Sequence, residues 1–104
     1  MSRMITGMLP FLALAALSSA AVAADAINGE TLAKRWCAAC HVVASDQQSG
    51  STQAPPFSAI ADKSGFDPGK LALFLLEPHP KMPNMNLSRN EAADLAAYIA
   101  TQGK

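Results

Sequence analysis

The chain has 104 residues, which is enough for one small domain. Its eight basic and eight acidic residues leave a formal net charge of zero at pH 7. A neutral chain without a run of Lys or Arg offers no electrostatic basis for binding nucleic acid or an anionic membrane surface.

The N-terminal segment has the pattern of a secretory signal peptide. It carries a single charge, Arg3, before an apolar stretch at residues 8–17. Small residues at positions 21–24 then supply the side chains that a signal peptidase requires. We therefore expect residues 1–24 to be a cleavable signal peptide.

Cleavage after Ala23 or Ala24 would leave a mature chain that starts at Ala24 or Asp25 and contains the domain at residues 25–104, exported to the periplasm. The alternative is a retained membrane anchor, because the uncharged stretch at residues 4–24 is long enough to span a bilayer. Glycine, proline and serine residues interrupt this stretch, and we therefore favour cleavage.

The first helix of the mature domain is predicted from Asn28 to about residue 39. Asn28 is a residue type that caps helix N-termini, and Leu32 and Trp36 recur at helical spacing. The polar segment at residues 44–54 predicts a surface loop. A short helix is expected in the apolar stretch at 57–61.

A Leu-rich helix is predicted at residues 70–77, because Asp67 and Pro68 form a typical helix start and Pro78 ends the segment. Its large apolar side chains cover nearly the whole circumference, so the helix is either buried or packed against a large apolar group. These side chains are Leu71, Leu73, Phe74, Leu75 and Leu76.

The last helix is predicted to begin at Ser88, where Glu91 completes a capping box, and to end before Gly103. The preceding loop at residues 78–87 holds three prolines and is predicted to be extended. No segment has the pattern of a βαβ unit. The fold class predicted from these elements is all-α, with three to four helices.

The residues that carry the chemistry are Cys37, Cys40 and His41. On a helix, residues three and four apart share one face. Two thiols at this spacing can add to the two vinyl groups on one side of a haem, while the histidine reaches the iron. The Cys-x-x-Cys-His motif is typical of c-type haem attachment.

Two other interpretations of the cysteines remain open. A thioredoxin-like dithiol lies at a helix start that follows a strand, whereas this pair lies at a predicted helix end. A zinc site needs four ligands, which His79 could complete, but zinc gives no reason for the Leu-rich helix. A structural disulfide would close too short a loop to add much stability.

The chain resembles the small class I cytochromes c from about Asn28 to Gln102. This resemblance implies that three to four helices surround one covalently attached haem c and that the first and last helices cross. It also implies that a proline carbonyl after the polar loop accepts a hydrogen bond from the haem-ligating histidine, and Pro55 fits this role better than Pro56. The residues that carry the resemblance are Gly29, Trp36, the motif at residues 37–41, Pro55, Met82-Pro83, Leu95, Tyr98 and Ile99; Gly29, Trp36, Leu95 and Tyr98 are expected at the crossing.

Outside the expected signal, the chain has two methionines, Met82 and Met85, and both lie in the proline-rich loop. A thioether is a soft iron ligand that raises the reduction potential. The resemblance favours Met82, which is followed by proline, while Met85, His79 and an open sixth position remain alternatives. The predicted site consists of Cys37 and Cys40 for haem attachment, with His41 and Met82 as iron ligands.

With both axial positions filled, the iron exchanges single electrons without binding a substrate, so we expect an electron carrier and no enzyme. Its partners would be redox proteins that dock transiently, and the protein would be a monomer without stable membrane insertion. One alternative is a haem subunit of a larger periplasmic or membrane-bound oxidoreductase complex. Another is a haem enzyme or gas sensor with an open sixth position.

The residues expected to form the wall of the haem pocket are Phe57, Ile60, Leu71, Phe74 and Leu75.

Overall fold

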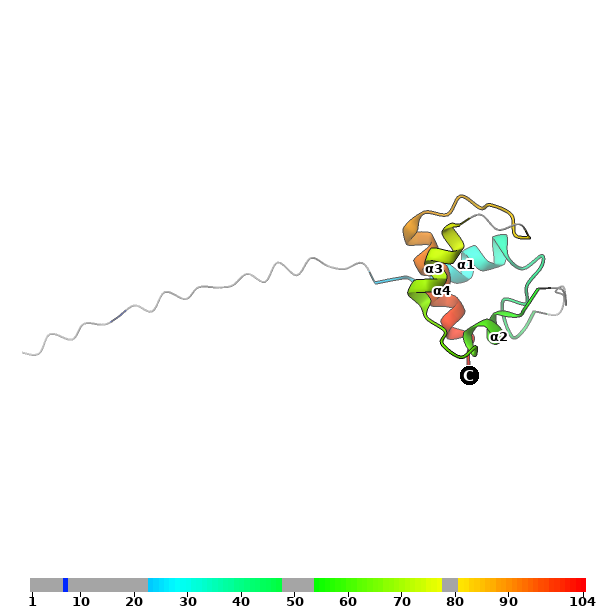
Figure 1. Cartoon of the computed structure of the whole chain (residues 1–104), viewed down its shortest axis with the longest axis horizontal. Coiled ribbons are helices and arrows are strands. Elements are labelled where there is room, and N and C mark those ends of the chain that lie inside the picture. Colours follow the sequence, from blue (N-terminus) through cyan, green and yellow to red (C-terminus); the bar gives the residue numbers. More distant parts are fainter. Residues whose placement is uncertain (1–6, 8–22, 48–53, 78–80) are drawn as a thin grey trace, which may run out of the picture.

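The computed structural model describes residues 7, 23–47, 54–77 and 81–104. Within these ranges the chain forms helices α1 (Ala26–Trp36), α2 (Phe57–Ala61), α3 (Pro68–Leu76) and α4 (Arg89–Thr101) (Figure 1). The same ranges contain no β-strand, which confirms the all-α prediction. Most of the expected signal peptide lies outside the described residues.

Helix α1 begins earlier than predicted, because its cap is Asp25 rather than Asn28. The Asp25 carboxylate accepts hydrogen bonds from the N–H groups of Ile27 and Asn28, at 2.9 and 3.1 Å. The Asn28 side chain instead donates to the carboxylate of Asp94 on α4, at 2.9 Å. Asn28 therefore ties two helices together, a role that depends on a residue far away in the sequence.

The other two helix starts predicted from local chemistry are confirmed. The Asp67 carboxylate accepts from the N–H groups of Gly69 and Lys70 at the start of α3, at 2.8 and 3.2 Å. At the start of α4, the Glu91 N–H donates to the Ser88 hydroxyl at 3.0 Å, and the Ser88 N–H donates to the Glu91 carboxylate at 2.9 Å. These caps satisfy backbone donors that a helix terminus leaves unpaired.

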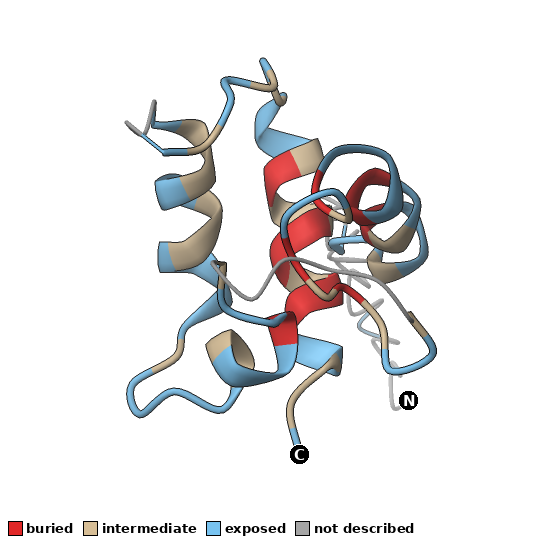
Figure 2. Ribbon diagram, turned by 90° about the vertical axis from the view of Figure 1, so that its right-hand side faces the viewer, coloured by how far each residue is buried: buried red, intermediate tan, exposed pale blue. Residues whose placement is uncertain are grey.

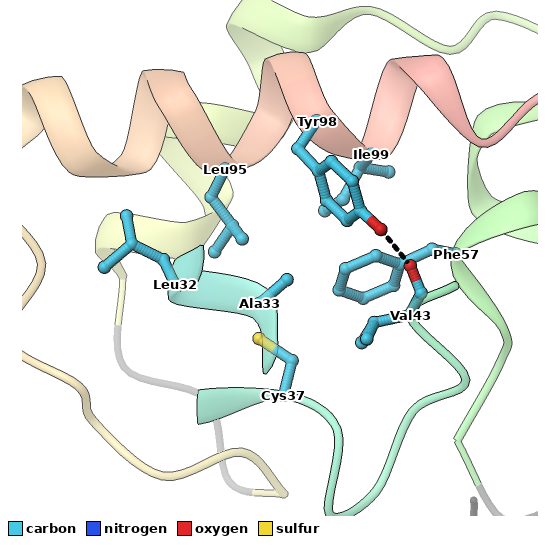
Figure 3. Close-up of a cluster of buried hydrophobic side chains, with 8 residues drawn as sticks. All are labelled: Leu32, Ala33, Cys37, Val43, Phe57, Leu95, Tyr98 and Ile99. Carbon is cyan, nitrogen blue, oxygen red and sulfur yellow. Dashed lines mark hydrogen bonds between the residues drawn. The ribbon is translucent and has the colours of Figure 1, made fainter. Parts of the chain in front are cut away.

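Helix α4 is the centre of the fold, because α1, α2 and α3 all pack against it. Buried positions gather on α1 and α4, whereas α3 has none (Figure 2). Side chains from α1, α2 and α4 and from the loop after α1 form one hydrophobic cluster (Figure 3). The cluster consists of Leu32, Ala33, Cys37, Val43, Phe57, Leu95, Tyr98 and Ile99.

The predicted crossing of the first and last helices is present, and Gly29 makes it possible. A Cβ atom at Gly29 would lie 2.0 Å from the carbonyl oxygen of Asp94 and 2.8 Å from the Cβ of Tyr98. Only glycine lets the two backbones approach this closely. Trp36, which was also expected at the crossing, does not join the cluster and is 43% exposed.

Helix α3 has no buried residue. Of the two outcomes predicted for this Leu-rich helix, burial in the core is therefore wrong. Leu71 and Leu75 pack against the hydrophobic cluster, whereas Leu73 and Phe74 are 66% and 51% exposed. None of the helices in the described part of the chain is long and apolar enough to cross a bilayer.

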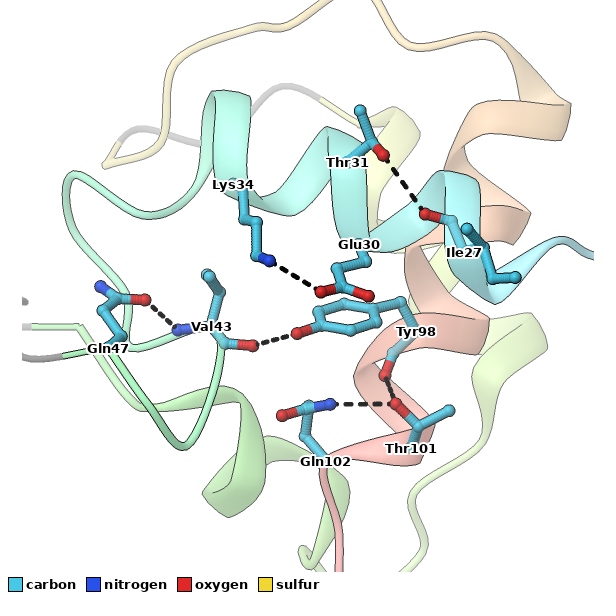
Figure 4. Close-up of polar contacts among 9 residues, drawn as sticks. All are labelled: Ile27, Glu30, Thr31, Lys34, Val43, Gln47, Tyr98, Thr101 and Gln102. Atoms are coloured by element: carbon cyan, nitrogen blue, oxygen red, sulfur yellow. Dashed lines mark hydrogen bonds and ion pairs between the residues drawn. The ribbon is translucent and has the colours of Figure 1, made fainter.

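The Tyr98 hydroxyl donates a buried hydrogen bond to the carbonyl oxygen of Val43, at 2.6 Å (Figure 4). This bond joins α4 to the loop that follows the cysteine–histidine motif. Burial, with a smaller contribution from Glu30, raises the pKa of Tyr98. The hydroxyl therefore remains a donor at neutral pH.

We expect Tyr98→Phe to lower the free energy of unfolding by about 1–2 kcal/mol, because it leaves a buried carbonyl without its partner. The measurement is guanidinium unfolding of the haem-loaded protein. Thr31→Val is the matched control: it removes an exposed hydroxyl that lies 3.4 Å from the Ile27 carbonyl, and we expect a change within about 0.5 kcal/mol. Equal losses in the two variants would contradict the prediction.

Candidate functional site

The cysteine–histidine motif follows α1 as a tight turn and not as a continuing helix. The N–H groups of Cys37 and Ala38 both donate to the Ala33 carbonyl, at 2.8 and 3.1 Å, and this sharing ends the regular helix before residue 39. The N–H groups of Cys40 and His41 then donate to the Cys37 carbonyl, at 3.1 and 2.8 Å. The turn therefore keeps the helical spacing on which the motif depends, although the predicted helix end is wrong.

The two cysteines are free thiols in different surroundings. Cys37 is buried in the hydrophobic cluster, whereas Cys40 is exposed. Burial raises the pKa of the Cys37 thiol to about 11, and the neighbouring Cys40 adds a smaller effect in the same direction. Before a haem is attached, Cys37 is therefore a neutral thiol at pH 7.

The imidazole of His41 is held by one backbone group. It is 9% exposed, and its Nδ1 lies 2.6 Å from the carbonyl oxygen of Pro55. A carbonyl oxygen can only accept, so Nδ1 carries the proton and the Nε2 lone pair is available to a metal ion. The Phe57 ring packs against the imidazole with 5.4 Å between ring centroids. The Pro55 contact implied by the resemblance is present.

One cleft brings all four predicted site residues together. Its volume is about 640 Å³, within the usual range of ligand and cofactor sites. The lining comes from the end of α1, the motif turn and two later segments of the chain. The lining residues are Trp36, Cys37, Ala39, Cys40, His41, Ala54, Pro55, Lys81, Met82 and Pro83.

The two candidate methionines have different surroundings. Met82 lines the cleft with both cysteines and His41. Met85 instead packs against the hydrophobic cluster. On either side of Met85, the Asn86 N–H donates to the Asn84 side chain at 3.0 Å, and Asn86 has a φ of 51°. His79, the other alternative ligand, lies outside the described residues.

The apolar residues expected as a pocket wall do not line this cleft. Phe57 is buried in the hydrophobic cluster, Ile60 packs against it together with Leu71 and Leu75, and Phe74 is half exposed.

Trp36 lines the cleft, whereas the sequence analysis predicted it at the crossing of the first and last helices. Its ring lines the cleft, and the guanidinium of Arg35 lies 5.2 Å from the ring centroid. Its position directly before Cys37 is the signal that could have placed it beside the motif.

The two competing interpretations of the cysteines gain no support from the structure. The motif follows a helix, whereas a thioredoxin-like dithiol follows a strand and begins a helix. Across residues 23–47, 54–77 and 81–104, no group of three or more His, Cys, Asp or Glu side chains is arranged to hold a metal ion.

The donor set fits a covalently attached haem. Two thiols lie beside an imidazole whose Nε2 is free to bind iron, and a thioether lines the same cleft. Imidazole and thioether are axial ligands that haem iron takes in proteins, and thiols at this spacing match haem attachment.

Comparison with known proteins agrees with this assignment. The cytochrome c family model matches residues 26–103. The chain is 54% identical over 97 residues to cytochrome c-552 of Bradyrhizobium diazoefficiens, and the match covers 93% of each chain. No solved structure matches significantly. The chain therefore belongs to the cytochrome c family, as a monohaem electron-transfer protein with covalently bound haem c.

Proposed function

We propose that Cys37 and Cys40 would attach the haem and that His41 and Met82 would bind its iron. The observation that carries this proposal is the His41 contact: Nδ1 is bonded to the Pro55 carbonyl at 2.6 Å, in the cleft that also holds both cysteines and Met82. Each thiol would add across one vinyl group, with its sulfur on one carbon and its hydrogen on the other.

The Pro55 carbonyl has two effects on His41. It fixes the tautomer in which Nε2 is the metal-binding atom, and it orients the ring. A hydrogen bond from Nδ1 to a carbonyl also strengthens electron donation from Nε2 to a bound metal ion. His41 is therefore a preorganised and strongly donating ligand, which favours the ferric state relative to a histidine without this partner.

Met82 is the better candidate for the sixth ligand. Its side chain lines the cleft, whereas Met85 already contributes to the hydrophobic packing. A thioether favours reduced iron, so Met82 opposes the effect of His41 and raises the potential.

These ligands support an electron carrier without enzymatic activity. When bound, haem supplies a reversible one-electron couple between ferrous and ferric iron. His41 and Met82 would both bind the iron, so no position would be left on it for a substrate. The chain itself would bind the group and orient its ligands in the cleft that Cys37, His41 and Met82 line.

We further propose that residues 1–24 are a cleavable signal peptide and that the mature domain, residues 25–104, works in the periplasm. The fold supports this boundary, because Asp25 caps α1 and its N–H donates to the Asp94 carboxylate at 2.7 Å. Ala23 and Ala24 are exposed and lie outside the helix. Cleavage after either residue would leave the packing of the domain intact.

The intact mass of the purified protein tests both proposals at once. We expect the mass of a chain that begins at Ala24 or Asp25 plus one haem, retained under denaturing conditions. A mass for residues 1–104 would contradict cleavage, and a mature chain without the haem increment would contradict covalent attachment.

An electron carrier of this family has redox partner proteins, and we propose that the monomer docks with them transiently. The alternative is a permanent haem subunit of a larger oxidoreductase complex. Gel filtration of a native extract separates the two: a carrier elutes at the size of the monomer, whereas a subunit co-elutes with oxidoreductase activity.

A further inference from the structure

The turn that carries Cys37, Cys40 and His41 has a second anchor besides Pro55. The side chain of Gln47 bonds three backbone groups of this segment. Its Oε1 accepts from the Val43 N–H at 2.8 Å, and its Nε2 donates to the carbonyl oxygens of His41 and Ala38, at 2.9 and 3.2 Å. Figure 4 shows the bond between Gln47 and Val43.

Gln47 reaches these groups because the chain turns back after the motif. Its own N–H donates to the Ala44 carbonyl at 3.2 Å. Both backbone polar groups of Val43 are consequently held by side chains. Its N–H donates to Gln47, and its carbonyl accepts from Tyr98. Backbone N–H and carbonyl groups are costly to leave unpaired when they are buried. The side-chain amide of Gln47 therefore stabilises the backbone conformation of residues 38–43.

Gln47 acts on the turn from outside the haem cleft. It lines a separate hollow of about 280 Å³ together with Ala38 and Val43. None of the residues that line this hollow lines the cleft that holds His41 and Met82. The bond to the His41 carbonyl directly links Gln47 to a residue proposed to bind the iron, so we expect its influence on the iron to pass through the backbone of His41.

We propose that Gln47 is a positioning residue that sets the strength of the His41–Pro55 hydrogen bond and, through it, the reduction potential. Gln47 holds the His41 backbone, and the Pro55 carbonyl holds the ring at 2.6 Å. Without Gln47 the turn relaxes, the bond to Pro55 lengthens, and the imidazole becomes a weaker donor to ferric iron. This proposal rests on His41 being an axial ligand.

The test compares Gln47→Leu with Gln102→Leu in the haem-loaded protein. Both substitutions remove a side-chain amide without changing the charge, and the side-chain amide of Gln102 donates to the Thr101 hydroxyl, which lies outside the site. The two readouts are exchange of the His41 Nδ1 proton, followed by NMR in the ferrous state, and the midpoint potential. We expect roughly tenfold faster exchange and a higher potential in Gln47→Leu, and neither change in Gln102→Leu.

Exchange of the Leu95 amide separates positioning from general stability, because Leu95 lies at the centre of the core and reports global opening. If His41 and Leu95 exchange accelerate by the same factor, or if the potential does not rise, Gln47 is not a positioning residue. If Gln47→Leu does not yield folded protein, Gln47→Asn replaces it, because Asn keeps the amide on a shorter side chain. This variant must also show faster exchange of the His41 Nδ1 proton and a higher midpoint potential. If the wild-type His41 ring protons lack the upfield shift of an imidazole bound to haem, the ligand assignment itself is wrong.

Discussion

Gly29→Ala is expected to destabilise the haem-loaded protein by about 2–4 kcal/mol, one of the largest effects of any single substitution in this chain. The added methyl group would lie 2.0 Å from the backbone oxygen of Asp94 and 2.6 Å from its carbonyl carbon. A backbone cannot move aside as a flexible side chain can, so α1 and α4 must separate. Guanidinium unfolding of the haem-loaded protein measures the loss.

The sign of this effect is informative, because helix propensity alone favours alanine over glycine by about 1 kcal/mol. Gly69→Ala is the control: a Cβ there would meet only a carboxylate oxygen of Asp67 within 4 Å, at 3.2 Å. We expect that variant to remain within about 1 kcal/mol of the wild type. Similar unfolding free energies for the two variants would contradict close contact between the α1 and α4 backbones.

Met82→Ala is expected to abolish the methionine–iron absorbance band at the red end of the oxidised spectrum. It should also lower the midpoint potential by on the order of 0.1 V or more, because the soft thioether that favours ferrous iron is lost. The measurement is a spectroelectrochemical titration of the purified variant.

Met85→Ala is the matched control, because it removes the same side chain from the same loop. Met85 packs against the hydrophobic cluster, so the expected result is a loss of roughly 1–2 kcal/mol of stability with the absorbance band retained. A band that persists in Met82→Ala and disappears in Met85→Ala would reverse the assignment.

Local chemistry was enough to predict two helix starts. Asp67 and Ser88 each form their cap with residues no more than three positions away, so the sequence contains all of the interacting groups. The start of α1 was missed because Asp25 and Asn28 are both good capping residues. The choice between them depends on Asp94, which accepts from Asn28 across the helix crossing.

The motif and its neighbours could likewise be predicted only in part. The sequence identified Cys37, Cys40 and His41 by spacing, and the structure brings them into one cleft with Met82. The contact between His41 and Pro55 required the resemblance, because no local pattern joins residues 14 positions apart.

Residues that depend on tertiary packing were missed. The exposure of Leu73 and Phe74 follows from how α3 lies on α4, and a helix that is apolar on all sides gives no signal for which face is covered. Gln47 lies in a polar segment next to a second glutamine, and nothing in the sequence distinguishes the two.

The most direct test is the reduced-minus-oxidised absorbance spectrum of the purified protein, together with a haem stain after denaturing electrophoresis. Covalent haem with His41 and Met82 as ligands predicts a sharp c-type α band and a stain that survives denaturation. A colourless protein at the mature mass would contradict haem attachment at Cys37 and Cys40.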